Sequence, residues 1–241
     1  MNCKTAFITG SAKRIGATIA KDLHTHGMNV VIHYHTSEHE AVQLKNTLNS
    51  IRSKSAFIVN GDLSQTNSYE ALVSKILGFT NRLDILINNA SLFYPTPMDE
   101  TTHMQWSEII RVNMMAPYFL GQSCRQHLEN NNGCIINITD IYGNHPLRNY
   151  PVYSASKAGL IMLTKAMALE MGPKIRVNAI SPGAILWPEE HDQHQKNEVL
   201  LRTILQRKGL PKDVASTVRY LIEGAEYTTG QVINVDGGRF L

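Results

Sequence analysis

A tyrosine and a lysine four residues apart, Tyr153 and Lys157, are the residues whose spacing points most directly to chemistry. Residues four apart on a helix lie on one face, one turn from each other. A phenol would therefore sit beside an ammonium group, whose charge favours the phenolate and lowers the pKa of the phenol. Such a phenol can give up a proton near neutral pH, as a general acid must. The pair also arises by chance, so its meaning depends on the elements around it.

The elements that would position this pair follow from the alternation of short apolar, β-branched segments with amphipathic ones. We expect strands at residues 6–8, 30–32, 56–59, 83–87, 134–138, 175–180 and 231–235. We expect helices at residues 15–26, 41–51, 69–77, 104–112, 116–128 and 153–171, with a further helical region before the last strand. Strands that are apolar on both faces and alternate with helices predict a parallel sheet covered on both sides. The fold class is therefore α/β: a single-domain, Rossmann-type doubly wound parallel sheet of about seven strands with helices on both faces.

One stretch breaks this alternation. Residues 187–197 lack a clean helical or strand period and include Pro188. The functional interpretation is a flap over a substrate site, spanning residues 184–207 of the single domain 1–241. The alternative is a plain surface loop.

Composition excludes several classes of protein. The 241 residues carry a formal net charge of +3, which is too small and too scattered to indicate nucleic-acid binding. No apolar run reaches the roughly 18 residues that span a bilayer, and no signal peptide is evident. The three cysteines, Cys3, Cys124 and Cys134, lack metal-binding spacing. This pattern favours reduced thiols and a cytoplasmic location.

A candidate phosphate-binding turn, Thr9–Gly16, lies between the first strand and the first helix. Rossmann-type folds present backbone N–H groups and a helix N-terminus to a pyrophosphate at this place. Gly10 permits the tight turn, Gly16 permits close helix packing, and Arg14 replaces the usual middle glycine with a cation. The alternative is a generic turn with a solvated basic pair. The coenzyme-binding candidates here are Gly10, Lys13, Arg14, Ile15 and Gly16.

The end of the second strand bears on the choice of coenzyme. NAD-binding folds usually carry Asp or Glu there for the ribose 2′-hydroxyl, whereas the first acid in this chain is Glu38, past the strand. A neutral-to-basic pocket suits a 2′-phosphate, so we expect NADPH. The alternative is a pair of surface histidines, and we expect no metal because no third ligand is evident. The candidates are His33, Tyr34, His35 and Ser37.

Two further loops follow strands at the carboxyl edge of the sheet, where such folds bind ligands. Asp62, followed by Leu63, can accept a hydrogen bond from the adenine amino group; alternatively it is the N-cap of the next helix. Asn89, Ala90 and Ser91 are small enough to pack against a ribose and a nicotinamide. A turn without ligand contacts is the alternative for this second loop.

Together these motifs resemble the short-chain dehydrogenase/reductases over essentially the whole chain. The residues that carry the resemblance are Thr9, Gly10, Gly16, Asn88, Asn89, Ala90, Asn113, Tyr153, Lys157, Pro182 and Gly183. Three runs are similar to the pteridine reductases within that family: residues 9–16, residues 33–37, and the Asn-Ala-Ser-Leu-Phe-Tyr-Pro-Thr-Pro run at 89–97. The resemblance adds Pro182 and Gly183 to the coenzyme-binding candidates.

The resemblance also identifies Asp140 as the residue that best discriminates among family members. Most members have a serine thirteen residues before the tyrosine, to hold a substrate carbonyl, whereas pteridine reductases have this carboxylate. Reduction of a C=N bond needs a proton on nitrogen, and a carboxylate can relay one or hold a protonated ring. The alternative is that Asp140 caps a loop in a carbonyl reductase.

The resemblance implies a role for each remaining site residue. Tyr153 would be the proton donor, Lys157 would lower its pKa and hold the nicotinamide ribose, and Asp140 would share the proton. Asn113 would anchor a relay water, or only stabilise a helix bend. The substrate candidates are Arg14, Ser91, Phe93, Asp140, Tyr153 and Trp187. Of these, Phe93 would stack on the pterin and Trp187 would cover the pocket, unless both are ordinary core or surface aromatics.

We therefore expect an NADPH-dependent reductase that converts dihydropterins to tetrahydropterins. Family members are usually tetramers, and residues 237–241 could reach a neighbour's pocket. Thr36 replaces an arginine of the better-known pteridine reductases, which bears on the strength of the preference for NADPH. The alternatives are a dihydromonapterin or dihydrofolate reductase, a 3-oxoacyl or other carbonyl reductase, and a non-catalytic NADPH sensor.

Overall fold

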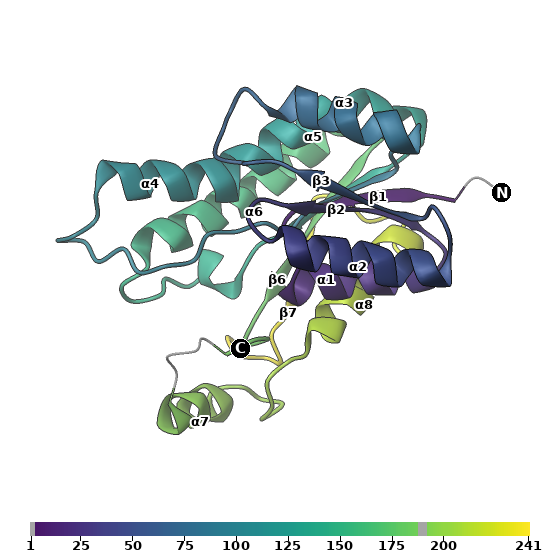
Figure 1. The fold of residues 1–241 in the computed structure, drawn as a ribbon. Coiled ribbons are helices and arrows are strands. Elements are labelled where there is room, and N and C mark those ends of the chain that lie inside the picture. Colours follow the sequence, from purple (N-terminus) through teal and green to yellow (C-terminus); the bar gives the residue numbers. More distant parts are fainter. Residues whose placement is uncertain (1–2, 188–191) are drawn as a thin grey trace.

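A single sheet of parallel strands organises the molecule (Figure 1). The computed structural model describes residues 3–187 and 192–241. Within them, seven strands lie in the order β3-β2-β1-β4-β5-β6-β7. Their bounds are β1 Thr5–Ile8, β2 Asn29–Tyr34, β3 Ala56–Asn60, β4 Ile85–Asn88, β5 Cys134–Ile138, β6 Arg176–Pro182 and β7 Val232–Val235. The predicted Rossmann-type fold is confirmed, because this strand order reverses between β1 and β4 as in doubly wound sheets.

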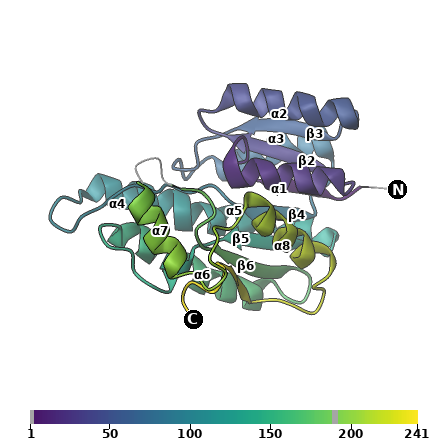
Figure 2. The same cartoon turned by 90° about the horizontal axis from the view of Figure 1, so that it is seen from below.

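Helices cover both faces of the sheet. Helices α1, α2 and α8 pack on the face nearest the viewer in Figure 2, and α3, α5 and α6 pack on the other. The helices are α1 Arg14–Thr25, α2 Glu38–Ile51, α3 Tyr69–Thr80, α4 His103–Ile110, α5 Ala116–Asn130, α6 Pro151–Met171, α7 Gln193–Leu201 and α8 Pro211–Glu223. A π-helical turn, η1 Arg111–Met115, joins α4 to α5, and a 3-10 turn, η2 Ile141–Gly143, follows β5. None of the described helices combines the length and the apolar run needed to cross a membrane.

The core has two apolar layers, one on each face of the sheet. Successive side chains of a strand point to opposite faces. In β1, Ala6 and Ile8 accordingly join the layer under α1, α2 and α8, whereas Phe7 joins the other layer. All three side chains are fully buried. Burial on both faces explains why the strands read as continuous apolar runs in the sequence.

The stretch predicted to be irregular, residues 187–197, contains the start of a helix. Helix α7 begins at Gln193, so the prediction was wrong from that residue onward. Asp192 accepts a hydrogen bond from the backbone of Gln195, whose side chain in turn accepts one from the backbone of Asp192. This capping box starts a helix that buries none of its side chains, and such a helix leaves no apolar period in the sequence. Residues 188–191 of the predicted flap, with Pro188, lie outside the described residues.

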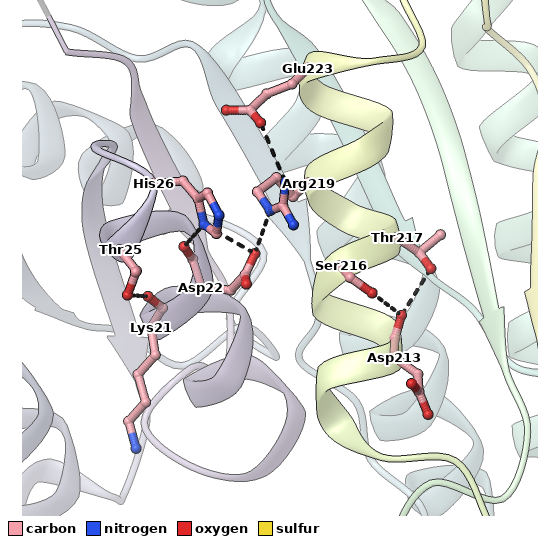
Figure 3. A network of polar contacts seen from close by, with 9 residues as sticks. All are labelled: Lys21, Asp22, Thr25, His26, Asp213, Ser216, Thr217, Arg219 and Glu223. Carbon is pink, nitrogen blue, oxygen red and sulfur yellow. Dashed lines mark hydrogen bonds and ion pairs between the residues drawn. The ribbon is translucent and has the colours of Figure 1, made fainter.

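An ion pair joins α1, the first helix, to α8, the last helix (Figure 3). Arg219 on α8 donates from Nε to Oδ2 of Asp22 on α1 at 3.1 Å, joining residues 197 positions apart. The ring of His26 lies 2.7 Å from the backbone oxygen of Asp22, and Glu223 approaches Arg219 only to 3.9 Å. Because Asp22 lies in the last turn of α1, this pair fixes that end of the helix to α8.

We predict that Asp22→Asn lowers the free energy of unfolding by about 1 kcal/mol, because it removes the charge from a partly buried pair. Glu223→Gln is the matched control and should change the free energy by at most a few tenths of a kcal/mol, since its contact is long and exposed. Urea unfolding of both variants measures the difference. Equal losses would contradict a specific contribution from the Asp22–Arg219 pair.

Candidate active site

The phosphate-binding turn has the backbone that its glycines require. Gly10 has φ of +58°, and a Cβ there would lie 2.9 Å from the Cα of Ala90. A Cβ at Gly16 would lie 2.6 Å from the backbone oxygen of Gly10. Arg14 has φ of +54°, a left-handed conformation that costs a residue with a side chain about 1 kcal/mol. Strain of this kind persists where the surroundings enforce it, often at functional sites.

The loop after β4 braces this turn through hydrogen bonds that spacing alone does not predict. Asn89 donates from Nδ2 to the backbone oxygens of Thr9 and Gly10, at 2.9 Å each. The backbone N–H groups of Asn89 and Ala90 donate to Oγ1 of Thr9 at 2.9 and 3.0 Å. The predicted ligand contacts of this loop remain predictions, and bracing the turn is a role that the sequence reasoning missed.

The N-terminus of α1 is suited to an anion. In the described part of the chain, its N-cap residue Lys13 makes no side-chain capping bond, and its first turn contains no acid. The ammonium of Lys13 pairs instead with Glu40 at 2.6 Å, and both side chains are at least a third exposed. The positive end of the helix dipole is thus available to a phosphate, with Arg14 exposed beside it. These residues fit the pyrophosphate of a dinucleotide.

The candidates at the end of β2 lie in different environments. His33 is 2% exposed, so the surface alternative is wrong for this residue. Both of its ring nitrogens are engaged inside the chain, which leaves neither to bind a ligand. Tyr34 is buried and bonds to Glu38, and burial together with that carboxylate raises the pKa of the phenol. His35 is exposed, as a residue that contacts a 2′-phosphate must be, and Ser37 is half-buried at the start of α2.

Asp62 stabilises a turn rather than the next helix. Its Oδ1 accepts from the backbone of Ser64 at 2.9 Å, and its Oδ2 accepts from Gln65 at 3.3 Å. Burial opposes ionisation of Asp62, but these hydrogen bonds outweigh it and lower the pKa of the carboxyl. Helix α3 begins only at Tyr69, so the N-cap alternative is wrong. Leu63 is buried, and its backbone oxygen accepts from the Tyr69 hydroxyl at 2.8 Å.

The reacting groups meet where β5 and α6 approach each other. The hydroxyl of Tyr153 donates to Oδ2 of Asp140 at 2.8 Å, and Oδ1 of Asp140 accepts from the backbone of Tyr142 at 2.9 Å. Lys157 is 2% exposed and donates from Nζ to the backbone oxygen of Ile138 at 3.0 Å. That Nζ lies 5.7 Å from the ring centre of Tyr153. The structure therefore brings together the three residues singled out from the sequence.

The surroundings of Tyr153 raise the pKa of its phenol, whereas the sequence led us to expect a lowered pKa. Burial raises the pKa of the phenol well above its usual range, and the bonded Asp140 carboxylate raises it further. Burial also raises the pKa of Asp140 and lowers that of Lys157 to about 8. The pKa of Tyr153 is thus raised by burial and by the bonded carboxylate, and the lowering effect expected of Lys157 stays a prediction. Asp140 and Tyr153 together hold a proton firmly at neutral pH.

Asn113 lies in the π-helical turn η1, a distortion often found at functional sites. It is fully buried, and its Oδ1 accepts from the backbone of Leu92 at 2.8 Å. Its Nδ2 donates to the Leu92 oxygen at 3.0 Å and to Ser156 at 3.1 Å. Asn113 thus ties the turn to α6 and to the loop that carries Phe93. Its role in anchoring a water stays a prediction.

The substrate side of the site is aromatic. Phe93 is 45% exposed, so the core alternative is wrong for this side chain. Its ring stacks on Tyr150 at 4.6 Å and meets Tyr153 edge-on at 4.8 Å. The sequence reasoning missed Tyr150, whose one signal was an aromatic residue directly before α6. Ser91 is exposed and bonds to the Tyr153 hydroxyl, and Trp187 is half-buried at the end of the first described range.

The last candidates lie beside the C-terminal segment. Pro182 pairs with Val235 of β7, and the Gly183 N–H donates to the Val235 oxygen at 3.0 Å. Farther along, Phe240 stacks on His145 at 4.1 Å, so residues at the C-terminal end pack on their own chain beside the Asp140 turn. Among the described residues there is no cluster of three or more His, Cys, Asp or Glu that could hold a metal.

Comparisons with known proteins agree with this geometry. A family model described as enoyl-(acyl carrier protein) reductase matches residues 10–239. The chain is 33% identical to pteridine reductase 1 of Leishmania tarentolae, over 97% of this chain and 95% of that protein. It is 32% identical to glucose 1-dehydrogenase 2 of Bacillus subtilis, over 99% of this chain and 95% of that protein. The solved structure of a blue fluorescent protein from a metagenomic library, in complex with NADPH, matches with a TM-score of 0.93 at 27% identity, covering 100% of this chain and 99% of that one.

The fold and the Asp140, Tyr153 and Lys157 site define an oxidoreductase built on a nicotinamide-dinucleotide-binding sheet. The chain belongs to the short-chain dehydrogenase/reductase family. Relatives of nearly equal identity carry names for different substrates, so family membership leaves the substrate open.

We predict that Gly16→Ala lowers the free energy of unfolding by about 2 kcal/mol, because its methyl group would meet backbone and Asn89 atoms that are themselves braced. Gly78→Ala in α3 is the matched control. The described structure leaves open space around it, so it should raise the free energy by about 0.5–1 kcal/mol. Chemical denaturation measures both variants. A stabilised Gly16→Ala protein would contradict the close approach of α1 to the turn.

Proposed function

We propose that this protein is an NADPH-dependent pteridine reductase, which reduces dihydropterins of the dihydrobiopterin type to tetrahydropterins. One observation carries the proposal. A carboxylate, Asp140, bonds to the Tyr153 hydroxyl at 2.8 Å beside the half-exposed ring of Phe93. A proton-holding pair next to an accessible flat ring suits the reduction of a C=N bond in a planar heterocycle.

The choice of NADPH rests on the phosphate-facing surfaces. The exposed residues after β2, His35 and Thr36, include no acid that would repel a 2′-phosphate. The uncapped start of α1 and the exposed Arg14 suit the pyrophosphate. The structurally similar blue fluorescent protein is described in complex with NADPH, which supports the same choice.

The proposed chemistry divides between coenzyme and protein. When bound, NADPH supplies a hydride to a carbon of the pterin ring. Tyr153 and Asp140 supply the proton to the ring nitrogen. Their raised pKa values keep a proton on the pair at neutral pH until a basic nitrogen arrives to accept it. We assign binding of the nicotinamide ribose to Lys157, which is held by the Ile138 oxygen, and the water that restores the proton to Asn113.

Binding of the flat substrate falls to the residues around Phe93. Its ring is held by stacking on Tyr150, so little side-chain motion is lost when a pterin stacks on it. Ser91 and Arg14 are exposed and can hydrogen-bond to both coenzyme and pterin. We assign the covering role to Trp187, which is half-buried in the segment after β6.

The rival functions differ from this one in identifiable ways. A dihydromonapterin or dihydrofolate reductase would use the same residues and differ only in the side chain of the pterin. A carbonyl reductase, of the 3-oxoacyl or another type, would have a hydroxyl at Asp140 to hold the substrate oxygen. A non-catalytic sensor would have no use for the bonded Tyr153 and Asp140.

We also propose that the protein works as a homotetramer. Large apolar side chains are exposed along α4, α5 and α6, which is where contacts between copies would bury them. They are Met104, Trp106, Tyr118, Met162 and Leu169.

Asp140→Ser should lower the turnover of dihydrobiopterin by about 10²-fold or more, because it removes one member of the proton-holding pair. NADPH affinity should change by less than about twofold, since Asp140 lies on the substrate side of the site. Asp140→Asn, which keeps the shape of the side chain, should lower the turnover of dihydrobiopterin to a similar extent. Unchanged pterin turnover with either variant would contradict the proton-holding role of Asp140, whereas unchanged ketone turnover by Asp140→Ser would favour a carbonyl reductase.

Thr36→Arg should lower the KM for NADPH by about tenfold, because a guanidinium would pair with the 2′-phosphate. The KM for NADH should not change, since NADH lacks that phosphate. Thr25→Arg adds the same charge at the exposed far end of α1 and serves as the control. If both variants improve NADPH binding equally, the effect is one of overall charge and this placement of the 2′-phosphate is wrong.

A further inference from the structure

A single buried histidine joins three segments of the coenzyme-binding edge. The Nδ1 of His33 accepts from the Gly10 N–H at 3.0 Å, and its Nε2 lies 3.1 Å from the Gly61 oxygen. Its backbone N–H donates to Oγ of Ser11 at 3.1 Å, and its backbone oxygen accepts from the Ser11 N–H at 2.9 Å. His33 on β2 therefore links the phosphate-binding turn to the loop that begins at Gly61.

These partners allow only one form of the ring. The Gly10 group is a donor, so the facing Nδ1 must carry a lone pair. The Gly61 group is an acceptor, so the facing Nε2 must carry the hydrogen. If Nδ1 carried a proton, its N–H group would face the Gly10 N–H group and the hydrogen bond between them would be lost. Burial lowers the pKa of His33 to about 4, which agrees with this neutral form.

The bonds to His33 also decide which groups remain for the phosphates. The N–H groups of Gly10 and Ser11 both point to His33, and are not free for a ligand. The pyrophosphate is then left to the N–H groups at the start of α1. At the other end, Gly61 precedes Asp62, the candidate for adenine recognition. The imidazole ring of His33 therefore bridges the phosphate end and the adenine end of the site, in addition to the pairing of β2 with β1 and β3.

We infer that His33 is a positioning residue for coenzyme binding, which fixes the phosphate-binding turn and the Gly61 loop relative to each other without touching the coenzyme. The inference rests on the proposed function only in taking NADPH as the ligand. It replaces the direct contact expected of His33 from the sequence, because both ring nitrogens already have partners.

Three substitutions separate the two ring contacts. In His33→Asn, the side-chain oxygen can stand near the position of Nδ1 and accept from Gly10. In His33→Gln, the side-chain amide can stand near Nε2 and donate to Gly61. His33→Leu can do neither. The control is His24→Leu, since His24 is also 2% exposed and bonds to Ser55 at 2.6 Å, on α1 outside the coenzyme-binding turns.

The measurement is the Kd for NADPH by fluorescence titration, with thermal unfolding of each protein in parallel. His33→Leu should raise the Kd by about tenfold or more, because two buried hydrogen bonds are lost. His33→Asn and His33→Gln should each bind NADPH more tightly than His33→Leu but less tightly than the parent protein. His24→Leu should lower the thermal stability yet leave the Kd within about twofold of the parent value.

Two results would overturn the inference: a parent-like Kd for His33→Leu, or equal weakening by His24→Leu, which would reveal a general effect of stability. A parent protein that does not bind NADPH at all would instead overturn the proposed function. Adenosine 2′,5′-bisphosphate, which lacks the pyrophosphate bridge, provides a second probe. His33→Gln should bind it better than His33→Asn does, because Gln retains the contact to the Gly61 loop.

Discussion

The hydrogen bond from the Tyr153 hydroxyl to Asp140 is the interaction on which the account of this site depends. A carboxylate beside a buried phenol raises the pKa of that phenol, so the pair keeps its proton where a lone phenol beside a lysine would lose it more readily. Lys157 donates to the Ile138 oxygen, and its Nζ lies 5.7 Å from the ring centre of Tyr153. Because the pair keeps its proton, we propose that the site delivers a proton to an atom more basic than a carbonyl oxygen.

The sheet places this pair beside the coenzyme-binding turns. All seven described strands are parallel, so their carboxyl ends meet at one edge and the loops that follow them converge. Side chains from neighbouring loops then brace each other. Asn89 holds the turn at Gly10 from one side and His33 holds it from the other. The strained backbone of Arg14 is tolerated within this network of fixed groups.

The fold, the phosphate-binding turn and the pairing of Tyr153 with Lys157 could be predicted from the sequence because their signals are local. Strand and helix periods, the spacing of Gly10 and Gly16, and the four-residue separation of Tyr153 and Lys157 are all visible along the chain. The predictions that failed depended on contacts between segments that are far apart in the sequence. The pKa of Tyr153 depends on Asp140, and the burial of His33 depends on partners in two other loops. Helix α7 was missed for a different reason, since it has no buried face.

The most direct test of the central claim is NADPH oxidation by the unmodified protein, followed by absorbance at one coenzyme concentration. The substrates are dihydrobiopterin, dihydromonapterin, dihydrofolate and an acetoacetyl thioester. Substrates carrying a dihydropterin ring should be reduced and the thioester should not, because Asp140 and Tyr153 are proposed to protonate a ring nitrogen. Rapid reduction of the thioester, with no oxidation of NADPH by any pterin, would contradict it.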